Sequence, residues 1–138
     1  MQNLARKKII IQKTGKRKKA VAKAVAKPGR GEVTINNRSL EIFQPELLKL
    51  FIKEPLILAG EVKDLDIDVS VKGGGVFGQA SAARQAIAKT LVENNKSLKE
   101  VFQNYDRTLL VADARRTEAH KPSASKRGPR RHKQRSKR

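Results

Sequence analysis

The sequence LDIDVSV, residues 65–71, alternates strictly between apolar and polar residues. Successive side chains of an extended chain point to opposite sides, so the four apolar residues share one face and the polar residues share the other. This segment is therefore predicted to be a β-strand with one buried face. Shorter β-branched or apolar runs predict further strands at residues 7–11 (KKIII), 33–35 (VTI) and 108–113 (TLLVAD).

Residues 20–27, AVAKAVAK, give a mixed signal. Alanine and lysine favour a helix by propensity. A period of two, however, places both valines on one face with two lysines, and the four alanines on the other. Residues 28–31, PGRG, have the composition of a turn. We therefore predict that residues 20–27 are a strand and form a hairpin, through this turn, with residues 33–35. The sequence NNR at residues 36–38 predicts a second tight turn.

A first helix is predicted from Pro45, because proline suits the first position of a helix. The apolar residues that follow at helical spacing are Leu47, Leu48, Leu50 and Phe51. Pro55 lacks the N–H that a helix interior needs, so we expect it to end or kink this helix near Lys53.

Residues 76–93 predict a second helix. One face of it would carry Val76, Ala80, Ala83, Ile87 and Leu91, whose small members allow the helix to lie close to a sheet. Ser97 and Glu100 match a capping box, which predicts a short third helix through Phe102. Strands and helices in this order predict an α/β two-layer sandwich with helices packed on a mixed sheet.

The sequence GGGVFG, residues 73–78, satisfies G-x-G-x-x-G between a predicted strand and a predicted helix. A dinucleotide site also needs an acidic residue about 20 positions later, at the end of the next strand. Glu93 has the spacing but ends a helix, and the remaining chain is too short for a doubly wound sheet. Two interpretations remain: the glycines permit positive φ in a close turn, and the amides at the helix start face a phosphate.

The net charge of +19 is confined to the two ends of the chain. Residues 1–30 hold 11 basic residues and no acid, residues 115–138 hold 11 basic residues and one acid, and residues 31–114 hold 10 basic and 12 acidic residues. Such blocks of like charge predict a polyanion as the binding partner. We expect nucleic acid rather than a membrane, because no apolar run approaches the roughly 18–20 residues of a span. Neither end contains an aromatic residue, which predicts contacts with the phosphate backbone rather than base stacking.

No other chemistry is predicted. The chain has no cysteine, which excludes disulfides and thiolate metal sites. His120 and His132 lie in the basic end and are expected to be solvated or to face phosphate. The acidic cluster at residues 64–68 is expected to be a solvated strand face. The absence of a leader pattern predicts that the chain is not secreted. We expect no catalytic residue, metal, cofactor or small-molecule substrate.

Four segments resemble the universal ribosomal protein nine of the small subunit, in order and approximate spacing. They are GKRKKAVAKA (15–24), GGGVFGQASAARQAIAKTL (73–91), DARRTEAHK (113–121) and QRSKR (134–138). EPLILAG (54–60) and the KKIII opening look like the archaeal branch of that family.

The resemblance implies the α/β fold of the second domain of small-subunit ribosomal protein five, with a left-handed βαβ crossover. It also implies a globular domain at residues 1–114, of which 1–30 are basic, and an extended basic tail at residues 115–138. The function implied is structural and not enzymatic. The protein would bind ribosomal RNA and neighbouring proteins in the head of the small subunit, in the cytoplasm, while its tail reaches transfer RNA in the P site.

The residues expected to contact ribosomal RNA are the basic residues of the matching segments and the tail, with the glycine loop. They are Lys16, Arg17, Lys18, Lys19, Gly73, Gly74, Gly75, Gln79, Arg84, Arg115, Arg116, Lys121, Lys126, Arg127, Arg130, Arg131, Lys133 and Arg135. Those implied to approach transfer RNA are Ser136, Lys137 and Arg138. Two other classes of protein remain alternatives: a free, chromatin-like protein that coats DNA, and a nucleotide-dependent enzyme.

Overall fold

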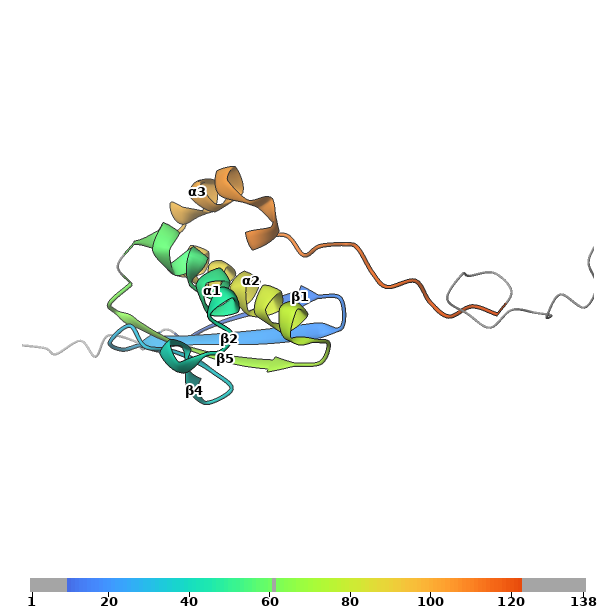
Figure 1. The fold of residues 1–138 in the computed structure, drawn as a ribbon. Coiled ribbons are helices and arrows are strands. Elements are labelled where there is room, and N and C mark those ends of the chain that lie inside the picture. Colours follow the sequence, from blue (N-terminus) through green and yellow to red (C-terminus); the bar gives the residue numbers. More distant parts are fainter. Residues whose placement is uncertain (1–9, 61, 123–138) are drawn as a thin grey trace, which may run out of the picture.

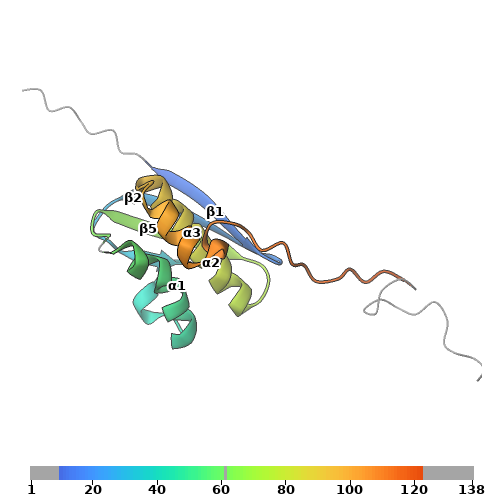
Figure 2. The same ribbon diagram turned by 90° about the horizontal axis from the view of Figure 1, so that it is seen from above.

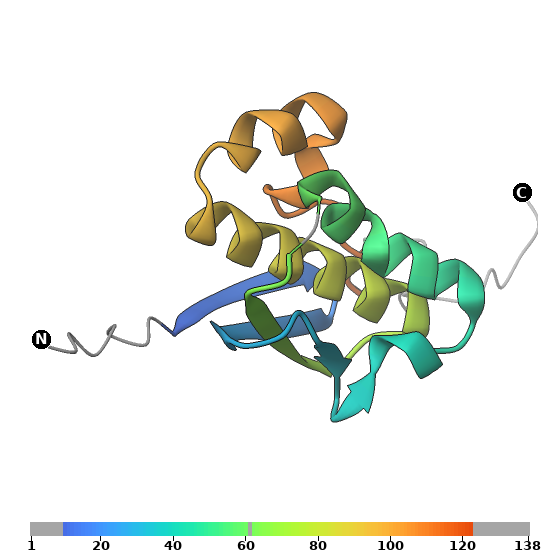
Figure 3. The same ribbon diagram turned by 90° about the vertical axis from the view of Figure 1, so that its left-hand side faces the viewer.

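The computed structural model describes residues 10–60 and 62–122, and in it helices pack on one face of a five-stranded mixed sheet (Figure 1). The strands are β1 (Ile11–Arg17), β2 (Ala20–Pro28), β3 (Val33–Ile35), β4 (Arg38–Ser39) and β5 (Leu65–Lys72). The α-helices are α1 (Glu46–Ala59), α2 (Val76–Asn94) and α3 (Leu98–Tyr105), and the short 3₁₀ helices are η1 (Leu40–Ile42) and η2 (Arg107–Leu109). Helices α1 and α2 cover the sheet, and α3 lies on their far side (Figure 3). The predicted fold class is confirmed.

The strand order is β1-β2-β5-β3-β4, and all neighbours are antiparallel except β3 and β5. This parallel pair is connected through β4, η1 and α1. The predicted strand at 65–71 is confirmed, because its four apolar residues are buried and its polar residues are not. The predicted turn at Asn36 and Asn37 is also confirmed, since both have positive φ and join β3 to β4.

The prediction that residues 20–27 form a hairpin with residues 33–35 is wrong. Strand β2 pairs with β1 and β5 instead. The cause is Asp66, whose Oδ1 accepts the backbone N–H groups of Arg30 (2.7 Å), Gly31 (3.0 Å) and Glu32 (3.0 Å). These bonds fix the loop at the edge of β5, so that β3 enters parallel to β5. They also lower the pKa of Asp66, and this carboxylate is a structural acceptor rather than part of a merely solvated face.

The first strand begins later than predicted. Of the expected strand at residues 7–11, residues 7–9 lie outside the described part of the chain, and β1 runs from Ile11 to Arg17. Residues 20–27 are a strand, as the period of two predicted, and all four of their alanines are fully buried. Short buried side chains on β2 leave room for α2 directly above them.

Helix α2 lies unusually close to β1. A Cβ atom added to Gly15 would be 2.1 Å from the carbonyl oxygen of Ala82 and 2.7 Å from the amide nitrogen of Ala86. Only glycine fits there, because both neighbours are helix backbone. Four residues of the predicted buried face are buried, Ala80, Ala83, Ile87 and Leu91, whereas Val76 at the helix start is exposed.

Helix α1 begins next to Pro45 as predicted, but Pro55 does not end it. The buried positions are Leu48, Ile52 and Pro55 itself. Leu56, Leu58 and Ala59 of the last turn pack partly buried against the core, and this packing offsets the missing hydrogen bond of proline. Most of the predicted apolar stripe instead faces outward, and Leu47 is 71% exposed.

The segment after α2 differs from the prediction in two respects. Helix α3 forms and buries Phe102, but no capping box precedes it, because the Ser97 hydroxyl donates to the Asn95 side chain 2.7 Å away. The predicted strand at 108–113 is absent. The Asp106 carboxylate accepts the backbone N–H of Thr108 at 2.8 Å and starts η2 in its place.

Replacing Gly15 with alanine should test the close approach of α2 to β1. We expect Gly15→Ala to lower the free energy of unfolding by about 3 kcal/mol, because the new methyl group meets backbone that must move. Urea denaturation of the purified protein measures this loss.

Gly78→Ala is the matched control within α2. A Cβ there would make an ordinary contact of 3.6 Å with Ala20 and Arg17. Alanine is the better helix former, so this variant should be about 0.5–1 kcal/mol more stable than the original chain. Equal stability of the two variants would contradict the packing argument.

Candidate nucleic-acid interface

The turn between β1 and β2 presents four consecutive basic residues, Lys16 to Lys19, at one end of the sheet. Arg17 pairs with Ala20 in the strand register, so Lys18 and Lys19 form a two-residue turn. The backbone of Lys18 is left-handed, with φ of +54°. Both turn lysines are exposed, whereas Arg17 is half-buried.

The glycine loop, Gly73 to Gly75, lies against this turn. Gly73 and Gly74 have φ of +77° and +65°, which confirms the structural interpretation of the glycines. A Cβ on Gly73 would be 2.6 Å from the carbonyl oxygen of Lys19. The Gln79 amide donates to the Gly73 carbonyl at 3.1 Å and holds the loop at the start of α2. No side chain caps α2, because Gly75 precedes it.

The chain returns to the same place after η2. The Arg116 guanidinium donates to the Lys18 carbonyl, and Arg17 lies 3.4 Å from the Asp113 carboxylate. Asp113 also accepts hydrogen bonds from the Arg115 guanidinium, at 2.7–3.1 Å. From this point the described chain extends away from the body, beyond the end of the β1–β2 hairpin (Figures 1 and 2).

We call this convergence the basic surface: the turn residues 16–19, the glycine loop 73–75, and Arg115 and Arg116. Its nearby carboxylate, Asp113, is already paired. The Arg115 guanidinium and backbone N–H, with a smaller effect of Arg17, hold the pKa of Asp113 well below its usual range. The charge of Asp113 is therefore compensated within the protein, and the exposed cations of the surface remain to attract an approaching anion.

Arg84, a predicted RNA contact, lies inside the protein. It is 5% exposed, and its guanidinium bonds to Glu54 at 2.6 Å and to Asp106 at 3.0 Å. It also stacks over the Phe51 ring, 4.6 Å from the ring centre. These contacts join α1, α2 and η2. Because its donors face protein partners, Arg84 is a structural residue and is not included in the basic surface.

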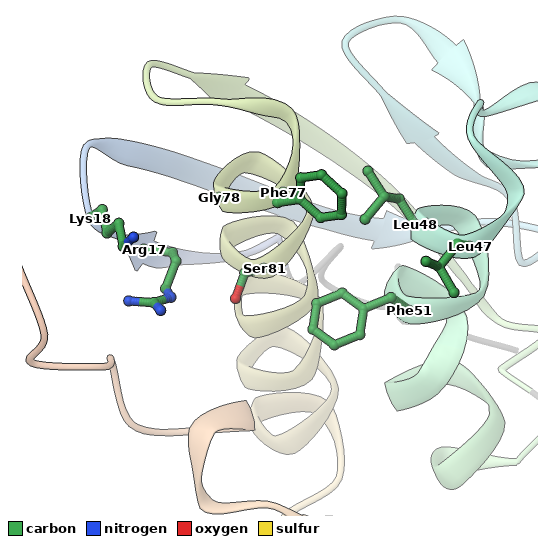
Figure 4. A pocket seen from close by; sticks show the side chains of 8 residues that line it. All are labelled: Arg17, Lys18, Leu47, Leu48, Phe51, Phe77, Gly78 and Ser81. Atoms are coloured by element: carbon green, nitrogen blue, oxygen red, sulfur yellow. The ribbon is translucent and has the colours of Figure 1, made fainter.

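Two features of this end of the molecule were not predicted from the sequence. The buried Gln85 side chain accepts the Lys16 backbone N–H at 2.8 Å and fixes the end of β1 on α2. An open pocket of about 450 Å³ lies beside the turn. It is lined by Arg17, Lys18, Leu47, Leu48, Phe51, Phe77, Gly78 and Ser81 (Figure 4). An apolar residue in the first turn after the glycines, Phe77, was the available signal for it.

The remaining predicted site residues are placed only in part. Lys121 is exposed in the extended segment, and so is His120. The contacts predicted for residues 126–138 lie outside the described part of the chain. Within residues 10–60 and 62–122, no helix is long and apolar enough to cross a membrane. The same residues contain no group of three or more potential metal ligands among His, Cys, Asp and Glu.

Comparison with known proteins gives consistent matches over nearly the whole chain. Residues 15–138 match the family Ribosomal protein S9/S16. Small ribosomal subunit protein uS9 of Methanococcus maripaludis strain C5 is 50% identical over 130 residues, which cover 92% of this chain and 97% of that protein. The proteins of the same name from M. maripaludis strain C7 and Methanococcus vannielii are 49% identical with the same coverage.

Replacing one buried and one exposed basic residue, each in its own variant, should separate effects on stability from effects on RNA affinity. Arg84→Met leaves two partly buried carboxylates without their partner, so we expect a loss of about 2–3 kcal/mol in the free energy of unfolding. Lys19→Ala should leave stability within about 0.5 kcal/mol of the original.

The salt dependence of RNA binding is the second measurement. Lys19→Ala should reduce the slope of log affinity against log salt by about 0.7–0.9, the value of one phosphate contact, and Arg84→Met should not change it. A smaller salt slope for a folded Arg84→Met protein would restore Arg84 as an RNA contact.

Proposed function

The chain belongs to the ribosomal protein S9/S16 family, and from this premise we propose that it is a structural, non-catalytic, RNA-binding constituent of the small ribosomal subunit. The matching relatives are named as proteins of that subunit and come from Methanococcus species, in keeping with the archaeal-like features of the sequence. The observation that supports RNA binding most directly is the basic surface. It collects cations from two separate segments beside the glycine loop, at the point where the basic terminal segment leaves the body.

The basic surface suits a folded RNA backbone. Lys18 and Lys19 offer ammonium groups at the tip of a rigid hairpin, where ordering them costs little backbone entropy. Arg115 is exposed and adds a planar fork for phosphate oxygens, although one edge of it already binds Asp113. The first N–H groups of α2 have no intrahelical acceptor and no side-chain cap, so they are open to a phosphate.

The basic segment that follows the body would extend this contact. We propose that residues 115–138 run along ribosomal RNA in the head of the subunit and that Ser136, Lys137 and Arg138 reach transfer RNA in the P site. The family assignment supports this, and the charge supports it independently: eight of the last 14 residues are basic and none is acidic. The place of action would then be the cytoplasmic ribosome, with neighbouring proteins of the head as further partners.

Sedimentation of a cell lysate tests the proposed function against its alternatives. The protein should travel with small ribosomal subunits and remain there after nuclease has removed DNA. A protein that coats DNA would instead sediment with DNA and be released when the nuclease removes it. Saturable binding of NAD or ATP in calorimetry would favour the enzyme alternative.

Deleting Ser136 to Arg138 should separate the two RNA partners. The truncated protein should still assemble into subunits, because the basic surface and most of the basic segment remain. Retention of transfer RNA in the P site should fall, as measured by filter binding on purified subunits. Removing residues 1–3, which have no charged side chain, is the matched control. Unchanged retention after the C-terminal deletion would refute the assignment of these three residues.

A further inference from the structure

The pocket beside the basic surface has a chemistry that phosphate binding does not use. It lies between the first turns of α1 and α2 and the end of β1 (Figure 4). Its volume of about 450 Å³ falls within the roughly 300–1,000 Å³ of pockets that take small organic groups. Lys18 belongs both to the pocket and to the basic surface, so the two are continuous.

Two phenyl rings face this pocket. Phe77 follows the glycine loop and is 72% exposed, although an aromatic side chain is usually buried. Phe51 is held in place, because the Arg84 guanidinium lies over its ring at 4.6 Å. In the view of Figure 4, the rings lie between the leucines of α1 and the side chains of Arg17 and Ser81. The pocket thus offers two aromatic surfaces, and Arg84 fixes the position of one of them, the Phe51 ring.

Polar side chains also line the pocket. Arg17 contributes to the wall of the pocket, but its Nη1 atom is buried and ion-paired with Asp113 at 3.4 Å, so this atom is not available to a ligand. The Ser81 hydroxyl makes no hydrogen bond within the described part of the chain, and Lys18 is exposed. Aromatic faces beside the Ser81 hydroxyl and the Lys18 ammonium group match a nucleobase, which has a π-face for stacking and acceptor atoms along its edge.

We propose that this pocket holds one unpaired base of the bound RNA, stacked on Phe77, while the adjoining phosphates lie on the basic surface. This inference rests on the proposed function and adds to it a contact with a base. An apolar side chain of another protein would fill the space but offer no acceptor to the Ser81 hydroxyl, at a cost. The sequence predicts little base stacking by the two basic ends, because they contain no aromatic residue. Phe51 and Phe77 belong to the body instead.

Substitutions of Phe77 in the full-length protein test the proposal, with a small-subunit ribosomal RNA transcript as the probe. Phe77→Ala should weaken RNA binding on the order of tenfold, the usual effect of losing one stacked base. The salt slope should stay unchanged, because no phosphate contact is lost. Phe77→Trp should keep the affinity, and Phe77→Leu should lose as much as alanine does, since leucine is apolar but cannot stack.

Val76→Ala is the matched control. Val76 is the neighbouring exposed residue, at 54%, and does not line the pocket, so this variant should bind like the original chain. Circular dichroism and thermal unfolding should be equal for all variants, because both side chains are exposed. As an independent readout, base-specific methylation of the RNA should show a nucleotide that the original protein protects and the Phe77→Ala protein does not.

The outcomes separate this proposal from the proposed function. If the original protein neither binds the transcript nor sediments with subunits, the proposed function fails. If it binds, but Phe77→Ala binds equally well or no base is protected, only the pocket assignment is overturned. Full affinity of Phe77→Leu with loss in Phe77→Ala would overturn stacking as well, and would favour an apolar contact such as a protein side chain.

Discussion

The close contact between α2 and the β1–β2 hairpin is the constraint on which the rest of the structure depends. It requires glycine at position 15, where a Cβ would come within 2.1 Å of the helix backbone, and alanine on the inner face of β2. Because α2 packs so close to the sheet, its first turn contacts the β1–β2 turn. The glycine loop and the turn lysines therefore form one surface, which neither segment provides alone.

A second interaction directs the chain after η2 to that surface. Arg84 on α2 binds Glu54 of α1 and Asp106 at the start of η2. A buried ion pair contributes little net stability compared with apolar packing, but it defines which groups must meet. Here it fixes η2 against α2. The residues after η2, which include Asp113 and Arg116, can then reach the β1–β2 turn. The packing of α2 on the sheet thus positions the β1–β2 hairpin, and Arg84 positions the segment that follows η2.

Patterns that depend on local burial were predictable from the sequence, and features that depend on distant partners were not. The period of two in residues 65–71 and the small residues of α2 each identify a buried face directly. The partner of β2 depends on Asp66, the continuation of α1 through Pro55 depends on the packing of its last turn, and η2 depends on Asp106.

The candidate site shows the same division. The turn lysines and the glycine loop stand out in the sequence, because four adjacent cations and three adjacent glycines are visible without a structure. Composition cannot distinguish an arginine that faces solvent from Arg84, which three protein groups surround. Nor can it bring Phe51 and Phe77 together, because they belong to different helices that meet only when α1 and α2 pack on the sheet.

The carboxylates of the body explain how a nearly neutral domain serves a strongly anionic partner. Asp66 is held by backbone N–H groups, Asp106 and Glu54 by Arg84, and Asp113 by Arg115. The pKa values of all three aspartates are lowered, so they stay ionised at neutral pH with their partners fixed. These acids are satisfied within the protein and do not need RNA. Among the described residues, no acid pairs with the lysines of the turn. Phosphate contacts of this kind set position, while a base contact sets identity. A surface with both kinds of group can therefore fix where the protein lies on RNA as well as hold it there.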